Sequence, residues 1–188
     1  MTEPADSSDQ HWFRRFRFSP EQADAVRQQI EFSCRSIDGG LGSADLLASL
    51  LELAWALSPL GREAEAAAFG RLAVDLARAG GDVASEIEAL LHTATALQYT
   101  GEPEAARALF ATGIELALGS GHTDNLHYLH HHLGRLEAEA LDPTTADELF
   151  TAALAQRRQM ADDGLVQSTE AALADLAAWV DLRRTTAP

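Results

Sequence analysis

The sequence contains one cysteine, no lysine and few aromatic residues, which make up 6% of the chain. The single thiol, Cys34, cannot form an intramolecular disulfide, so side-chain packing has to hold the fold. Its place on the apolar side of a predicted helix favours a buried, unreactive side chain. Gly-rich phosphate loops, nucleophile elbows and the strand patterns that carry them are also missing. We therefore expect a protein that is not an enzyme and that uses no cofactor.

Basic residues are outnumbered as well: 14 basic residues stand against 29 acidic ones, which gives a formal net charge of −15 at pH 7. A nucleic-acid partner needs an extended basic face, and an anionic membrane attracts basic segments. The first ten residues are polar and acidic where a signal peptide carries basic charge. No apolar run reaches the length of a membrane span without a charge. These deficits predict a cytoplasmic protein with neither nucleic acid nor a membrane as its partner.

The chain is rich in alanine and leucine, which supply most of the 46% of residues that are hydrophobic. Strong helix formers with small side chains favour helices packed on helices over a sheet. Residues 87–126 read as two amphipathic helices joined at Thr100 and Gly101, followed by a polar turn. The same pattern recurs forty residues earlier and forty residues later without a gap. The chain is therefore predicted to be an array of repeated helix pairs.

Small and aromatic residues mark the register of this repeat. Gly61 and Gly101 lie forty residues apart, and Leu141 lies forty residues beyond Gly101. Small side chains let paired helices approach closely, and large aromatic ones fill the space between successive pairs. Positions of both kinds recur at the same spacing: Ala54, Ala94 and Gly134; Ala66, Ala106 and Ala146; Phe110 and Phe150.

These residues resemble the tetratricopeptide repeat family, whose unit is a helix pair with the pattern W-x2-L-G-x2-Y…A-x3-F…P. The second copy carries the pattern most completely, in Leu90, Thr93, Ala94, Leu97, Gly101, Ala106, Phe110 and Gly113. The forty-residue unit is similar to the longer-helix variants of bacterial regulators and kinesin light chains. It departs from the pattern where Arg78, Leu118 and Arg158 replace the terminal proline. The resemblance implies an all-α fold, a right-handed α-solenoid of antiparallel helix pairs with about eight helices.

The domain organisation follows from this register. Residues 1–18 form an N-terminal tail that ends in an arm of aromatic and Arg residues, and residues 19–188 form one helical repeat domain. Within that domain, the sequence predicts a leading helix at 19–38, repeats at 47–86, 87–126 and 127–166, and a closing helix at 167–185.

In the tetratricopeptide family, the first helices of successive pairs line a concave groove that holds peptides. The resemblance assigns to this groove Glu52, Trp55, Leu91, His92, Thr95, Tyr99, Tyr128, His131, His132 and Arg135. The Lys and Asn of the family's carboxylate clamp do not occur at these places. The remaining mixture of aromatic, His and Arg side chains suits stacking on a peptide and hydrogen bonding to it. We therefore expect a non-catalytic scaffold for a peptide or protein partner; packing of Trp55 between helices is the structural alternative.

Histidines gather in the third copy, in the stretch HTDNLHYLHHHLGR. His127 and His131 are four residues apart on one helical face, a spacing that suits two metal ligands. Consecutive histidines point about 100° apart on a helix, so the cluster cannot converge as a unit, and no HExxH motif is present. We expect histidines without a bound metal, and keep a metal-binding or metal-sensing module as the alternative function.

The arm from His11 to Phe18 alternates four aromatic residues with three arginines. It would pack as a cap over the first helix, as repeat arrays require, or dock into a groove of its own chain or of a neighbour. No second helix follows the closing helix, so one of its faces is left to water or to another subunit. A homodimer through the C-terminal helix or the N-terminal arm, and with it a self-assembling structural unit, is a further alternative.

Overall fold

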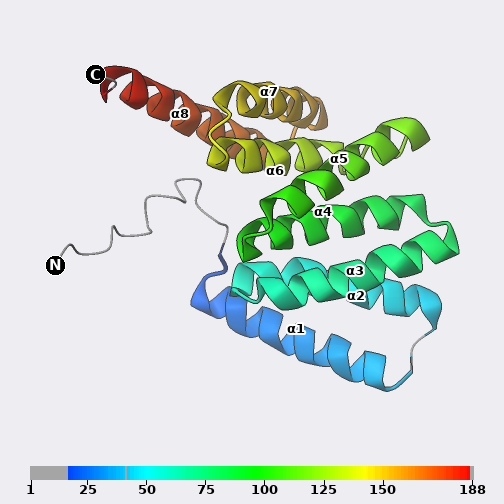
Figure 1. The fold of residues 1–188 in the computed structure, drawn as a ribbon. Helices are drawn as coiled ribbons and strands as arrows, with labels where there is room; N and C mark the ends of the chain where they lie inside the picture. Colours follow the sequence, from blue (N-terminus) through cyan, green and yellow to red (C-terminus); the bar gives the residue numbers. More distant parts are fainter. Residues whose placement is uncertain (1–16, 41, 187–188) are drawn as a thin grey trace. The chain divides into compact units, whose positions relative to one another are not determined.

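The structure, a computed structural model, describes residues 17–40 and 42–186, and helices form most of that stretch (Figure 1). No strand occurs in these residues, so the all-helical class is confirmed. The elements are α1 (Pro20–Asp38), α2 (Ser43–Leu57), a 3-10 turn η2 (Ser58–Leu60), α3 (Glu63–Gly80), α4 (Val83–Thr100), α5 (Pro103–Ser120), α6 (Leu126–Glu139), α7 (Pro143–Met160) and α8 (Asp163–Thr186).

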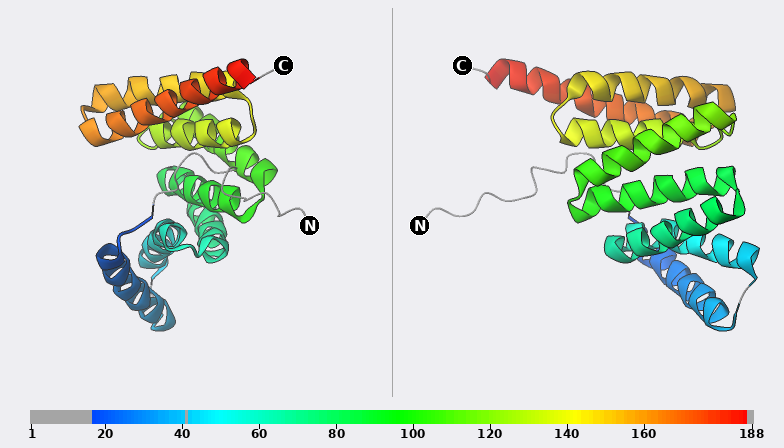
Figure 2. Two further views of the ribbon diagram at one scale, coloured as in Figure 1. Left: turned by 90° about the vertical axis from the view of Figure 1, so that its left-hand side faces the viewer. Right: turned by 45° about the vertical axis from the view of Figure 1, so that its right-hand side comes forward.

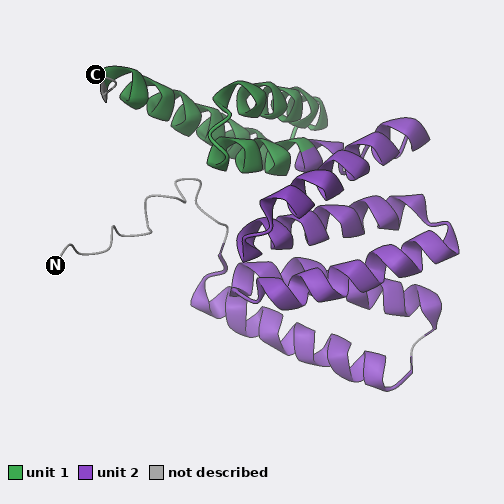
Figure 3. Ribbon diagram, in the orientation of Figure 1, with its two compact units in different colours: residues 1–15, 130–188 green, residues 16–129 purple. Residues whose placement is uncertain are grey.

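The described chain divides into two compact units: the first unit along the chain, purple in Figure 3, ends at Leu129, and the second, green in Figure 3, begins at His130. The boundary falls inside α6. In the first unit, each helix from α1 to α5 packs against the next, and α2 also contacts α4 directly. Figure 2 shows these helices running back and forth beside one another. In the second unit, α7 packs against α8.

Helix starts follow from capping residues in the sequence. Ser19 and Gln22 form a capping box at α1, in which each side chain accepts a hydrogen bond from the other residue's backbone N–H. Asp82 caps α4 by accepting from the backbone N–H of Ser85, and Asp142 caps α7 in the same way. Side-chain caps of this kind satisfy backbone donors that the first helical turn leaves open.

Helix ends recur at intervals of twenty residues. A residue in the left-handed backbone conformation stands at each of six positions: Gly61, Gly81, Gly101, Gly121, Leu141 and Ala161. Glycine adopts this conformation without steric cost. Leu141 (φ 66°) and Ala161 (φ 57°) adopt it at a steric cost, because each carries a Cβ atom that lies too close to the backbone carbonyl oxygen. The repeat in the sequence is therefore a repeat of backbone geometry, and its third copy keeps the geometry without the glycines.

The core of the first unit is built from aliphatic and small residues of α2, α3 and α4. One buried cluster holds Leu47, Leu50, Leu51, Ala73, Val74, Ala77, Ala89 and Leu90. Two helical glycines mark the closest approaches: a Cβ at Gly70 would collide with Thr93, and one at Gly113 would come within 2.9 Å of Leu129. Packing this close leaves no room for a larger side chain at either position.

In the second unit, Phe150 is completely buried in a cluster with Ala138 and Ala146, and with Ala172 and Leu176 of α8. Gly134 lies directly over the Phe150 ring, because a Cβ at this glycine would stand 3.0 Å from two ring carbons. The register therefore identified both members of a close contact between α6 and α7.

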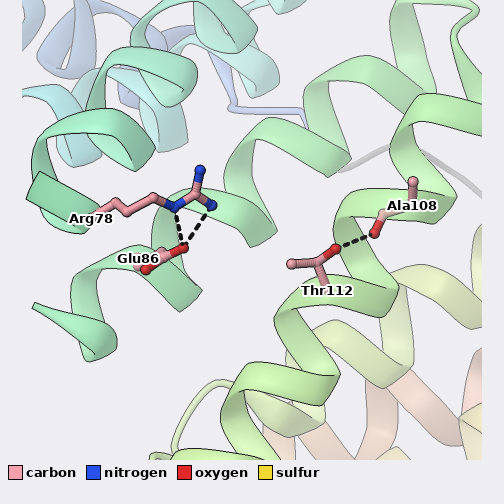
Figure 4. A network of polar contacts seen from close by, with 4 residues as sticks. All are labelled: Arg78, Glu86, Ala108 and Thr112. Carbon is pink, nitrogen blue, oxygen red and sulfur yellow. Dashed lines mark hydrogen bonds and ion pairs between the residues drawn. The ribbon is translucent and has the colours of Figure 1, made fainter. Parts of the chain in front are cut away.

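Arginines at the end of α3 and of α7 reach the following helix. Arg78 donates to Glu86 at the start of α4, with Nη2 2.7 Å from Oε1 (Figure 4). Arg158 of α7 is 2.9 Å from Glu170 of α8. Arg78 and Arg158 occupy two of the positions where the tetratricopeptide pattern has proline. In both places the arginine forms an ion pair with the following helix. Figure 4 also shows Thr112 donating back to the Ala108 carbonyl within α5.

Among the described residues, the helical stretch Ser43–Leu60 is long and apolar enough to span a membrane by length and composition alone. It includes two acids, Asp45 and Glu52, and its Leu53 and Leu57 are completely buried inside the first unit. The helix thus gains its hydropathy from residues that form a protein core, as core helices of globular domains do.

Candidate binding surface

Helices α2 and α4 each leave a stripe of side chains incompletely buried, at matching positions of the repeat. On α6 some of the matching residues are half-buried, whereas Arg135 is buried and His130 and Leu133 on other faces are half-buried as well. The opposite faces of α2 and α4 are buried, as at Leu53, Ala54, Thr93 and Ala94. The stripes comprise Ala48, Glu52 and Trp55 on α2; Glu88, His92, Thr95 and Tyr99 on α4; Tyr128, His132 and Glu139 on α6. Since α2 and α4 contact each other in the first unit, their stripes belong to one surface.

On α2, Trp55 is the most exposed of the predicted groove residues, with 48% of its surface accessible. Glu52 is half-buried, and its Oε2 accepts a hydrogen bond of 2.7 Å from the Ser33 hydroxyl of α1. That bond fixes the carboxylate against the leading helix. Trp55 therefore supplies the larger share of what α2 can present to a ligand.

On α4, the stripe presents His92 and Tyr99, which are both half-buried. Nε2 of His92 lies 3.6 Å from Oε1 of Glu88, four residues earlier on the same face. The hydroxyl of Thr95 donates to the Leu91 carbonyl at 2.8 Å, which uses its proton within the helix. Leu91 itself is buried, so its contribution is to packing beneath the stripe.

The described end of the N-terminal arm lies on this surface. The rings of Phe18 and Trp55 meet edge to face, with centroids 5.7 Å apart and planes inclined by 68°. Arg17 forms an ion pair of 2.7 Å with Glu63 at the start of α3, and also donates to the Ser58 carbonyl. The predicted arm thus contacts α2 and the turn after it through its last two residues. Its other residues, and the tail before them, lie outside the described residues.

On α6, the predicted groove residues divide between two environments. Tyr128 and His132 are half-buried, whereas His131 and Arg135 are buried, with 5% and 8% of their surfaces accessible. The ring of His131 packs against Phe150, with 5.4 Å between the centroids. His131 therefore faces the core of the second unit.

His131 belongs to a buried polar network that joins α6, α7 and α8. Nη1 of Arg157 lies 3.3 Å from Nδ1 of His131, 2.6 Å from the Thr169 hydroxyl and 3.1 Å from the Leu165 carbonyl. Arginine can only donate, so Nδ1 of His131 is the acceptor and the ring carries its proton on Nε2.

Sequence reasoning did not single out Arg157, which is only 2% exposed. The repeat register contains a signal for it, because Ala77 and Ala117 stand at the same position of the earlier copies and both are completely buried. A charged residue at a position that is otherwise small and buried indicates a polar partner nearby. That partner is supplied jointly by His131 and Thr169.

The two histidines of the metal hypothesis are both buried. His127 is 2% exposed, and its ring lies 4.0 Å from that of Tyr128 between centroids. Nδ1 of His131 faces the Arg157 guanidinium, whose positive charge opposes a metal ion at that nitrogen. In the part of the chain that the structure describes, no three His, Cys, Asp or Glu side chains are grouped so as to hold a metal.

Three side chains with shifted pKa values have structural explanations. Hydrogen bonds from the capped backbone lower the pKa of Asp82, through Ser85, and of Asp142, through Thr145. Burial lowers the pKa of His130, and a hydrogen bond to Gln156 partly opposes that shift. Helix capping and packing account for these shifts, so none of the three calls for a catalytic role.

No protein-family model matches this chain, and no curated protein has a significant match to it.

Proposed function

We propose that the chain is a non-catalytic scaffold of the tetratricopeptide type, a right-handed α-solenoid that binds a peptide or protein segment along the stripes of α2 and α4. The left-handed residues at intervals of twenty and the packing of consecutive helices support this architecture. Small residues at the helix crossings support it as well, since Ala54, Ala94 and Ala106 are at most 1% exposed.

The main support for the proposed binding function is the stripe of partly accessible side chains on α2 and α4. The positions of Glu52, His92 and His132 recur at forty-residue intervals, and each of these residues stays partly accessible. Residues on the opposite faces of α2 and α4, such as Leu53 and Thr93, are buried. A surface of Trp, Tyr and His offers stacking area and hydrogen-bonding groups at low entropic cost, which suits recognition of a peptide. The net charge of −15 further favours a basic segment as the ligand.

Selection of peptides on the immobilised full chain tests the proposal. A displayed library of random peptides would be panned on the wild type, on His92→Ala/Tyr99→Ala, and on Leu72→Ala/Leu118→Ala. Leu72 and Leu118 are exposed residues of α3 and α5, 54% and 62% accessible, so their variant is the matched control. Circular dichroism and melting establish that all three chains fold alike.

The expected result is one family of enriched peptides for the wild type and the control. Their affinity for the stripe variant should fall by at least tenfold, about 1.4 kcal/mol, since aromatic and His anchors concentrate binding energy. Equal enrichment on all three chains, or no enrichment at all, would show that the stripes do not bind peptides.

A further inference from the structure

An exposed aromatic ring and a carboxylate are neighbours on the stripe of α2. Trp55 keeps 48% of its surface accessible, although the ring of Phe18 meets it edge to face at 5.7 Å. Glu52 stands three residues earlier, and side chains at this spacing lie next to each other on a helix, with about 5–6 Å between their Cβ atoms. All three residues belong to the first unit, in which α2 packs against both α1 and α4.

The carboxylate of Glu52 is held in place by the protein itself. Its Oε2 accepts a hydrogen bond of 2.7 Å from the hydroxyl of Ser33, a residue of α1 that is 2% exposed. One hydrogen bond uses only part of the acceptor capacity of a carboxylate. The remaining acceptor positions of Glu52 can therefore serve a ligand at a reduced entropic cost, because the side chain is already ordered.

We propose that Trp55 and Glu52 form a subsite for one arginine side chain of the bound peptide, whose guanidinium stacks on the indole ring and donates to the carboxylate. This inference rests on the proposed function and deepens it, because it names a residue type that the ligand carries. Arginine suits the pair better than lysine does, since its planar guanidinium stacks on an aromatic ring and holds several donors in a fixed fork.

The formal charges on the two stripe helices favour a cation. With His counted as neutral, residues 43–57 and 83–100 contain no Arg or Lys, and their acids are Asp45, Glu52, Glu86 and Glu88. Glu86 is paired with Arg78 of α3, whereas the side chain of Glu88 is 43% exposed on the same surface as Glu52. Complementary charge of this kind steers a ligand and fixes its register on the surface.

The chain already contains an arginine stacked on a tryptophan. On α8, Cζ of Arg183 lies 4.5 Å from the centroid of the Trp179 ring. A cation within about 6 Å of an indole centroid is attracted to the face of the ring, and a carboxylate beside the ring adds a charge-assisted hydrogen bond. Arg17 of the first unit is held by Glu63 and by the Ser58 carbonyl, so its guanidinium is engaged beyond the end of α2.

Titration of the isotope-labelled full chain with N-acetyl-arginine amide, followed by NMR at the indole N–H signals, tests the subsite. The signal of Trp55 is identified by its loss in Trp55→Phe. This signal is expected to shift saturably with the arginine amide. N-acetyl-citrulline amide has the same shape but a neutral urea group in place of the guanidinium, so it should bind about tenfold more weakly.

A matched pair of variants locates the carboxylate. Glu52→Gln should weaken binding of the arginine amide by roughly tenfold, while its amide oxygen can still accept the hydrogen bond from Ser33. Glu115→Gln makes the same charge change at an exposed position of α5 and should leave the affinity unchanged. Equal affinities for the arginine and citrulline amides would overturn the inference. The absence of a saturable shift at Trp55, or equal effects of the two variants, would overturn it as well.

Selection of peptides from the library keeps this inference apart from the proposed function. If the selected peptides need His92 and Tyr99 but bind equally well after citrulline replaces their arginines, the arginine subsite is wrong and the proposed function stands. If the arginine amide binds at Trp55 while the library yields no enriched peptide, the subsite is retained and the peptide scaffold fails.

Discussion

Arg157 of α7 donates to Nδ1 of His131 on α6 across 3.3 Å, and both side chains are buried. The same guanidinium nitrogen reaches the Thr169 hydroxyl of α8 at 2.6 Å. One cation thus joins three helices of the second unit, at a position where the earlier copies of the repeat have alanine. Polar contacts that are buried and mutually satisfied fix the relative positions of helices more specifically than apolar packing does.

Replacing Arg157 by alanine, the residue of the earlier copies, is expected to destabilise the chain. The change leaves His131 and Thr169 without their shared donor and opens a cavity, so the free energy of unfolding should fall by roughly 2–4 kcal/mol. Urea unfolding followed by circular dichroism measures the loss.

The adjacent residue supplies the control. Arg158 is exposed and pairs with Glu170 at 2.9 Å across a solvated surface. Arg158→Ala should therefore cost less than about 1 kcal/mol. A loss as small as this for Arg157→Ala would mean that the buried network does not hold the second unit together.

Replacing a left-handed residue of the third copy by glycine should stabilise the chain, in contrast to Arg157→Ala. Leu141 is 50% exposed and adopts φ 66°, so Leu141→Gly removes backbone strain and little buried surface. The strain of about 1–2 kcal/mol is partly offset by the greater entropy of glycine in the unfolded chain, which leaves a gain of roughly 0.5 kcal/mol. Thermal melting should show the increase.

The reverse change at the matching position calibrates this gain. Gly101 has φ 84° and open space around its Cβ direction, so Gly101→Ala tests backbone strain alone. It should lower the free energy of unfolding by about 1 kcal/mol. If Leu141→Gly and Gly101→Ala shift the melting temperature in the same direction, the two positions do not share a backbone conformation.

The repeat register was enough to predict the helical class and the close contacts at small residues. Gly61, Gly101 and Leu141 mark helix ends because every copy needs a left-handed residue there, whichever side chain carries it. Such a requirement is local, so a sequence pattern can reveal it.

The buried polar network could not be predicted in the same way. Whether Arg157 is buried depends on an acceptor from α6 and another from α8, which the spacing within one helix does not show. For the same reason, the register placed His131 and Arg135 among the ligand-facing residues, while the structure buries both. The forty-residue register locates the helix ends, but the third copy has different neighbours around the predicted groove positions.

The third copy also introduces a pH dependence through His130. Leu50 and Leu90 occupy this position in the earlier copies, and burial lowers the pKa of His130 below its ordinary value of 6.5. The unfolded chain therefore takes up a proton first, so folding stability is complete above pH 6.5 and declines as the pH falls toward the lower folded pKa.

His130→Leu should remove this decline and raise the stability at neutral pH by about 1 kcal/mol, since a leucine buries more apolar surface there. Urea unfolding at pH 7.5 and pH 5 measures both effects. His122→Leu, at an exposed position of a turn, is the matched control and should keep the acid sensitivity of the wild type. Identical pH profiles for wild type and His130→Leu would contradict the prediction.

The close approach of Gly134 to Phe150 predicts that adding one methyl group destabilises the second unit. A Cβ at this position would lie 3.0 Å from two carbons of the ring and 3.3 Å from Cβ of Leu149. Overpacking of this kind costs about 1–3 kcal/mol, of which the better helix propensity of alanine returns roughly 1 kcal/mol. Gly134→Ala should therefore lower the free energy of unfolding.

Gly119 near the end of α5 separates the two contributions, because nothing lies within 4 Å of its Cβ direction. Gly119→Ala should gain up to about 1 kcal/mol from helix propensity alone. A double-mutant cycle with Phe150→Leu then isolates the contact: the cost of Gly134→Ala should shrink once the ring is gone, while the gain at Gly119 should not change. If Gly134→Ala stabilises the chain as Gly119→Ala does, α6 and α7 do not approach each other closely at this crossing, and the small-residue register loses its physical basis in the third copy.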